Sequence, residues 1–141
     1  MKDLNFILVD DNEIFRETLK KFLTDEFSSK VVAEVNRGEE LLTIDNIHVA
    51  DIIFINLVLP GVNDFEIVKR ILWNYPLLNV IGITYYTDGI YLLQLVEAGF
   101  KGGLDKNKIF DEVADAVGTV MGGNYYFSSS ILKNCICDYK Q

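Results

Sequence analysis

The sequence predicts a doubly wound α/β domain built around a parallel sheet of five strands. Uninterrupted apolar runs of strand length, such as residues 4–9, are typical of parallel strands that are covered on both faces. Segments with apolar residues at helical spacing follow these runs along the chain. Because strands and helices alternate five times, the strands are expected to pair in parallel through right-handed crossovers.

The first unit begins with the strand at residues 4–9, which ends at the two acids Asp10 and Asp11. A helix is predicted from Asn12, since apolar side chains recur there at helical spacing with charged residues between them. Those apolar positions are Phe15, Leu19, Phe22 and Leu23. Either Asp11 or Asn12 can cap this helix, and Glu13 suits its positively polarised first turn.

The remaining four units follow the same pattern. Further strands are predicted at residues 30–35, 51–56, 78–84 and 101–105. The helices that follow them are predicted over residues 38–44, from about Phe65 to Trp73, over residues 90–98, and over a segment that carries Phe110, Val113, Val117 and Val120. Gly99 closes the helix over residues 90–98, and Gly122 with Gly123 closes the last one, because glycine readily adopts the C-cap conformation.

The bulk properties exclude several classes of protein. A chain of 141 residues, half of them hydrophobic, fits one domain with a packed core. Its net charge of −8 and its lack of a basic run argue against direct nucleic-acid binding. Cys135, Cys137 and the lone His48 do not make a zinc site. With no signal-peptide pattern or membrane-length apolar run, we expect a cytoplasmic protein that makes no membrane contact.

Polar residues gather at one rim of the predicted sheet. In a doubly wound sheet, ligands bind at the carboxyl ends of the strands. The residues delivered there are Asp10, Asp11, Asn56, Thr84 and Lys106. Taken singly, each could be a helix cap or a solvated loop residue. Their joint placement predicts a functional site.

Five stretches of the chain carry a resemblance to a known family. They are "FILVDDNEIFRETL", "DIIFINLVLPGVNDFEI", "VIGITYYTD", "LVEAGFKGGLDK" and "VGTVMGGNYYFSSSI". From residue 4 to about 132 the chain resembles the receiver domain of bacterial two-component response regulators of the NarL/FixJ (LuxR-type) family. The resemblance implies a flavodoxin-like (βα)5 fold, a receiver-like domain over residues 1–121, and a tail over residues 122–141 that is similar to the start of an interdomain linker.

The family transfers a phosphoryl group to an aspartate at the tip of the third strand, assisted by Mg²⁺. The resemblance implies the following roles: Asp10 and Asp11 as metal acids, Val58 as a backbone metal ligand, Thr84 and Lys106 as the phosphoryl pocket, and Asn56 at the position of the phosphoacceptor. An amide has no free oxygen anion, so an acyl phosphate cannot form on Asn56. Mg²⁺ binding remains possible through Asp10, Asp11, the Asn56 amide oxygen and Val58, but one lost charge should weaken it.

Two further departures from the family pattern lie beside this rim. Gly103 stands where the family usually carries an aromatic residue, so no ring from the fifth strand can switch position. Tyr85 replaces the usual small residue after the hydroxyl residue. Its ring either plugs the pocket mouth or lies on the surface.

The expected function is a signalling module that acts through protein–protein contacts, not an enzyme. Its partner would be a histidine kinase, a phosphotransfer protein or an output domain. The helix over residues 90–98 is poor in charge, which indicates either a broad core contact or an exposed face for a homodimer. We favour the N-terminal part of a DNA-binding transcription regulator over a single-domain protein.

Two alternative functions remain open at this point. The chain could be a conventional Mg²⁺-dependent receiver in which Asn56 substitutes for an aspartate. A nucleotide-binding or small-ligand domain is disfavoured, because the loop after the first strand is acidic and lacks phosphate-binding glycines.

Overall fold

The computed structural model describes residues 3–57 and 62–133 of the chain. Its strands are β1 (Leu4–Val9), β2 (Ser29–Val35), β3 (Ile52–Leu57), β4 (Asn79–Thr84), β5 (Gly102–Asp105) and β6 (Tyr126–Phe127). Its α-helices are α1 (Glu13–Glu26), α2 (Val62–Asn74), α3 (Gly89–Ala98) and α4 (Ile109–Met121), and its 3₁₀ helices are η1 (Gly38–Thr43), η2 (Ile47–Val49) and η3 (Lys106–Lys108).

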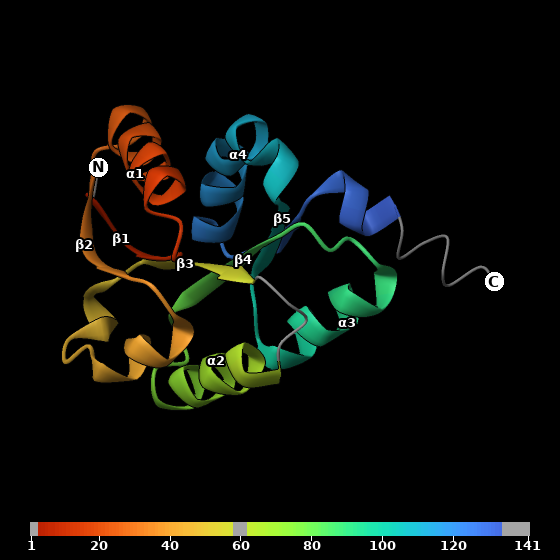
Figure 1. The fold of residues 1–141 in the computed structure, drawn as a ribbon, viewed down its shortest axis with the longest axis horizontal. Helices are drawn as coiled ribbons and strands as arrows, with labels where there is room; N and C mark the ends of the chain where they lie inside the picture. Colours follow the sequence, from red (N-terminus) through yellow and green to blue (C-terminus); the bar gives the residue numbers. More distant parts are fainter. Residues whose placement is uncertain (1–2, 58–61, 134–141) are drawn as a thin grey trace.

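The strands form one parallel sheet in the order β2-β1-β3-β4-β5-β6. Helices α1 and α4 cover one face of the sheet, and α2 and α3 cover the other (Figure 1). This arrangement confirms the predicted doubly wound, flavodoxin-like fold.

Both faces of the sheet are buried, which explains the uninterrupted apolar runs in the sequence. Along β1, Phe6 and Leu8 pack in the core beneath α1 and α4, whereas Ile7 and Val9 pack in the core beneath α2 and α3. All four side chains are at most 3% exposed. Successive residues of a strand point to opposite faces, so a strand covered on both sides needs apolar residues at every position.

The prediction of five strands is wrong by one, because β6 adds a sixth at the edge of the sheet. It is two residues long and pairs in parallel with β5, Tyr126 opposite Gly102 and Phe127 opposite Gly103. A Cβ atom on Gly102 would lie only 2.7 Å from the Tyr126 carbonyl oxygen, so glycine permits this close approach. A strand of two residues is too short to produce a periodic pattern.

The structure selects one of the two expected caps after β1 and modifies the short helix expected after β2. Asn12 caps α1, because its Oδ1 atom accepts a hydrogen bond from the Phe15 amide at 3.0 Å. The short helix predicted at residues 38–44 is the 3₁₀ helix η1. The Glu40 carboxylate fixes its start by accepting the Arg37 amide at 3.1 Å.

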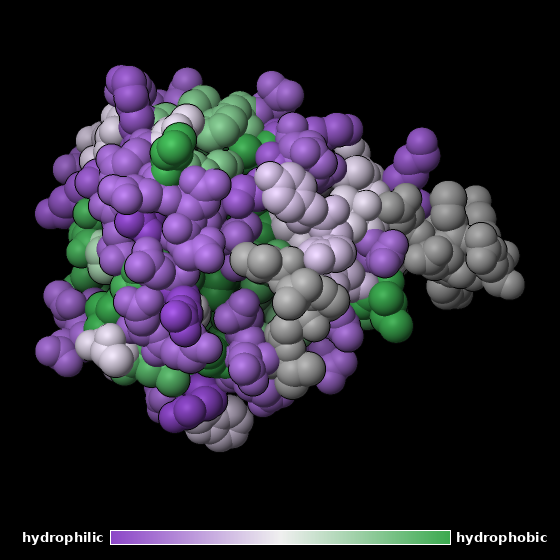
Figure 2. All heavy atoms as spheres, in the orientation of Figure 1, coloured by the Kyte–Doolittle hydropathy of each residue, from purple (hydrophilic) through white to green (hydrophobic). Residues whose placement is uncertain are grey.

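Hydrophilic residues cover most of the face shown in Figure 2, in keeping with the acidic composition. Of the helices in the two described ranges, none has the length and apolar character needed to cross a membrane.

Candidate functional site

Four of the predicted site residues lie at the carboxyl-terminal rim of the sheet. Asp10 follows β1 directly, Asn56 is the penultimate residue of β3, and Lys106 follows β5. Thr84 is the last residue of β4. Val58, predicted to offer a backbone oxygen, lies outside the described residues.

The Lys106 ammonium joins two of these strand ends. Its Nζ atom lies 3.2 Å from Asp10 Oδ2 and 3.2 Å from Asn56 Oδ1. The Lys106 and Asp10 side chains are 8% and 5% exposed. This ion pair is therefore shielded from water, and its electrostatic attraction is stronger than that of a surface pair.

Two aromatic rings also contact the same ammonium. Its Nζ atom lies 4.2 Å from the centre of the Phe15 ring and 5.5 Å from that of Tyr85. A cation is attracted to the electron-rich face of a ring within about 6 Å. Phe15 was expected only as a core position of α1, and its spacing in the sequence gives no sign of the contact with Lys106. Tyr85 is 61% exposed, yet its ring still reaches Lys106.

Asp10 is held from several directions. Its Oδ1 atom accepts the Asn12 amide at 2.8 Å, while Oδ2 accepts Lys106. Arg16 of α1 donates to the Asp10 carbonyl oxygen at 2.6 Å and to Asn36 at 2.7 Å, which ties the end of β1 to the loop after β2. Asp11 is exposed. The two acids therefore lie in different environments.

Thr84 is turned into the protein. It is fully buried, and its hydroxyl accepts the Tyr86 amide at 2.9 Å. The adjacent Tyr91 hydroxyl is buried without a hydrogen-bond partner in the described part of the chain. Burial raises the pKa of Tyr91 to about 12. The structure thus brings Asp10, Asn56 and Lys106 into contact, and Thr84 lies buried at the end of the adjacent strand β4.

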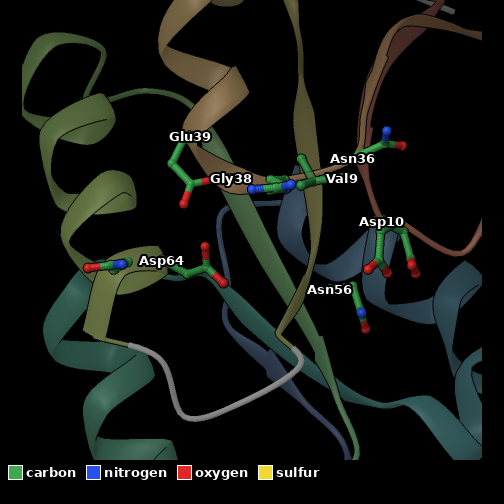
Figure 3. Close-up of a pocket in the computed structure, with 10 residues that line it drawn as sticks. Val9, Asp10, Asn36, Gly38, Glu39, Asn56 and Asp64 are labelled. Carbon is green, nitrogen blue, oxygen red and sulfur yellow. The ribbon is translucent and has the colours of Figure 1, made fainter.

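A cleft of about 400 Å³ opens beside Asp10 and Asn56 (Figure 3). Its polar lining residues are Asp10, Asp11, Asn36, Arg37, Glu39, Asn56, Asn63 and Asp64. Glu39 and Asp64 lie across the cleft from Asp10 and Asn56 in Figure 3. Burial, assisted by the negative charge of Glu39, raises the pKa of Asp64. The lining holds four acids and one arginine, so the cleft is acidic.

The described residues suit Mg²⁺ poorly. Among residues 3–57 and 62–133, no three His, Cys, Asp or Glu side chains converge as a metal site would require. One of the two candidate carboxylates, Asp10, has both oxygens engaged, one of them by the Lys106 ammonium. Asn56 offers only a neutral oxygen, and that oxygen also accepts from Lys106.

Comparison with known proteins identifies the class. The family described as response regulator receiver domain matches residues 6–118, so the chain belongs to this family. Receiver domains generally bind Mg²⁺ for phosphorylation, and the proteins of this family serve in two-component signalling.

The individual relatives are LuxR/NarL-type response regulators. The chain is 28% identical to the response regulator UvrY of Escherichia coli K12, over 91% of its own length and 59% of UvrY. It is 27% identical to the transcriptional regulatory protein DegU of Brevibacillus brevis, over 98% of its length and 58% of DegU. The chain thus spans about three fifths of the length of the curated relatives it matches.

Solved structures confirm the fold. A LuxR-family two-component response regulator from Aurantimonas superposes with a TM-score of 0.89 at 23% identity, covering 99% of this chain and 100% of that one. The isolated receiver domain of RcsB from Salmonella enterica gives a TM-score of 0.78 at 20% identity, covering 94% and 99% of the two chains.

Proposed function

We propose that this chain is a receiver-like signalling module that is not phosphorylated at Asn56 and acts through protein–protein contacts. The observation that carries the proposal is the hydrogen bond from Lys106 to the Asn56 amide oxygen at 3.2 Å. This bond supports the proposal, because it holds the amide beside the lysine at the rim where the family's phosphoacceptor is expected.

The chemistry of the amide supports the proposal. The Asn56 oxygen carries no full negative charge, and the nitrogen lone pair is delocalised, so neither atom can act as the attacking nucleophile that an acyl phosphate requires. With Asn56 neutral, Asp10, Asp11 and Lys106 carry one net negative charge, where an aspartate at position 56 would make it two. Mg²⁺ binding is accordingly expected to be weak.

The partner is a histidine kinase, a phosphotransfer protein or an output domain in the cytoplasm. Related chains extend well beyond the matched region, which supports a DNA-binding part outside this sequence. A solved structure of RcsB contains two dimers bound to two parallel DNAs. In the present domain the acidic cleft and the net charge of −8 disfavour direct DNA contact.

Helix α3 supports a homodimer face. Ile90 and Leu93 are 66% and 64% exposed, so the helix has an apolar side that no described residue covers. Tyr91 and Leu92 of the same helix are buried in the core.

A conventional receiver, in which Asn56 replaces an aspartate, is the second candidate. The retained Lys106–Asp10 pair favours it, because that pair would still serve a phosphoryl group if the nucleophile were restored.

Incubation with acetyl phosphate and Mg²⁺, followed by intact-mass measurement, separates the two. We expect no mass gain for the native chain and a gain of one phosphoryl group for Asn56→Asp. Stoichiometric phosphorylation of the native chain would overturn the proposal, and an unlabelled Asn56→Asp variant would show that the pocket has lost more than its nucleophile.

A further inference from the structure

After α4 the chain returns to the sheet and lies beside β5, the strand that immediately precedes Lys106. The Tyr126 amide donates to the Lys101 carbonyl at 3.0 Å, and the Ser128 amide donates to the Gly103 carbonyl at 2.9 Å. Residues 126–131, here called the docked segment, therefore begin with β6, which pairs with β5 as an edge strand of the sheet.

Gly103 leaves room for the ring of Phe127. A Cβ atom at Gly103 would lie 3.1 Å from Phe127 Cδ1 and 2.9 Å from Leu95 Cδ1. The ring thus fills the space that a side chain at position 103 would take. Ile131 anchors the other end of the docked segment with no exposed surface.

A buried polar cluster fastens the docked segment to the end of β5. The Asp105 amide donates to Ser128 Oγ at 2.8 Å, and Ser130 Oγ donates to Asp105 Oδ2 at 2.9 Å. Ser128 is fully buried and Asp105 is 6% exposed. In such surroundings an unmet hydrogen bond is costly, so the cluster holds together as a unit.

Asp105 extends this cluster to the site. Its second carboxylate oxygen, Oδ1, accepts the Asn107 amide at 3.0 Å and so caps η3, whose first residue is Lys106. One carboxylate therefore holds the docked segment with one oxygen and the turn that presents the Lys106 ammonium with the other.

We propose that Ser128 and Ser130 are positioning residues for Lys106, so that docking of residues 126–131 is energetically coupled to the contacts of Lys106 with Asp10 and Asn56. Such coupling is reciprocal. Loosening the docked segment shifts Lys106, and removing the contacts of Lys106 loosens the docked segment. The state of the site is thereby transmitted to the chain that follows α4 without a phosphoryl group.

Hydrogen exchange and NMR together test this coupling. Ser130→Ala removes one hydrogen bond at a half-buried position, and Ser129→Ala, at an exposed neighbouring position, is the matched control. We expect Ser130→Ala to accelerate exchange of the Tyr126 and Ser128 amides about fivefold or more, and to shift the side-chain NMR signals of Lys106. Ser129→Ala should leave both unchanged.

The coupling is tested in the opposite direction with Lys106→Met, which should accelerate hydrogen exchange of the Tyr126 and Ser128 amides. If Ser130→Ala proves unstable, Asp105→Asn tests the same link, because it keeps the backbone donor to Ser128 and alters only the carboxylate. Two results would overturn the proposal. One is unchanged amide exchange in Ser130→Ala. The other is faster amide exchange in Ser130→Ala while the Lys106 signals stay identical to those of Ser129→Ala. Since neither readout involves phosphorylation, this coupling and the function proposed for Asn56 can fail independently.

Discussion

Lys106 donates to the Asn56 amide oxygen across 3.2 Å, although 50 residues separate the two in the chain. The same ammonium pairs with Asp10 at 3.2 Å. A cation that belongs to the protein therefore already satisfies both oxygens, and an added divalent cation has to compete with it.

Asn56→Asp should strengthen Mg²⁺ binding. We expect the affinity to rise about tenfold or more, because a unit charge about 4 Å from another contributes up to about 4 kcal/mol at an effective dielectric near 20. Isothermal titration calorimetry measures the change. Asn63→Asp is the control, since it adds the same charge at an exposed position in the same cleft. Equal gains in the two variants would contradict a site centred on position 56.

Lys106→Met should destabilise the fold. Removing one partner of a buried ion pair leaves Asp10 uncompensated, and we expect the free energy of unfolding to fall by about 3 kcal/mol. Urea denaturation measures it. Lys21→Met, which breaks a pair whose side chains are 78% and 64% exposed, should cost less than about 1 kcal/mol. A similar loss in both variants would mean that the Lys106 pair is no stronger than a surface contact.

Gly103 and Phe127 should behave as a complementary pair. Phe127→Ala leaves a void, and Gly103→Phe forces a ring into space that Phe127 and Leu95 already occupy, so each change alone should destabilise the fold. Combining them should recover stability, with an interaction energy of about 1–3 kcal/mol in a double-mutant cycle. Strictly additive losses would show that the two positions do not share one space.

Asp64→Asn should stabilise the protein near neutral pH. Burial raises the pKa of Asp64 in the folded state above its ordinary value of 3.8, so the folded protein is penalised once this carboxyl ionises. The gain should be present at pH 7, should shrink as the pH falls through the raised folded-state pKa, and should vanish below 3.8, where the carboxyl is protonated in both states. Denaturant titrations at several pH values measure it. A gain that does not depend on pH would point to a cause other than ionisation.

Leu93→Glu should abolish any homodimer formed through α3. The side chain is 64% exposed, so the charge is tolerated in the monomer but not in an apolar contact. Sedimentation velocity at micromolar concentration measures the association. Leu77→Glu, at a residue 93% exposed just after α2, is the control. A dimer that survives Leu93→Glu would have to use another face.

Much of the fold could be predicted because its signals are local and repeated. The buried strands β1 and β3 are continuous apolar runs, and parallel topology alone brings Asp10, Asn56 and Lys106 to one rim. Thr84 was expected at the same rim, where it ends β4, but residue type and position do not reveal which contacts its hydroxyl makes. In the structure it accepts the Tyr86 amide inside the protein.

The features that sequence reasoning missed depend on contacts between distant segments. Phe15 has the spacing of an ordinary core residue of α1, and only the tertiary fold brings its ring to Lys106. Ser128 and Ser130 lie in a serine-rich stretch that suggests a loop. Their bonds to Asp105 exist only once the chain has returned to β5. No local pattern encodes these pairings.

The two-residue length of β6 also bears on how the domain behaves in a crowded solution. An exposed sheet edge offers unpaired amide and carbonyl groups that can recruit strands from other molecules and seed aggregates. At the edge formed by β6 the outermost strand is too short to template such growth, and without it the longer edge of β5 would be exposed. Variants that detach this strand should therefore precipitate more readily at high concentration, even where their stability is little changed.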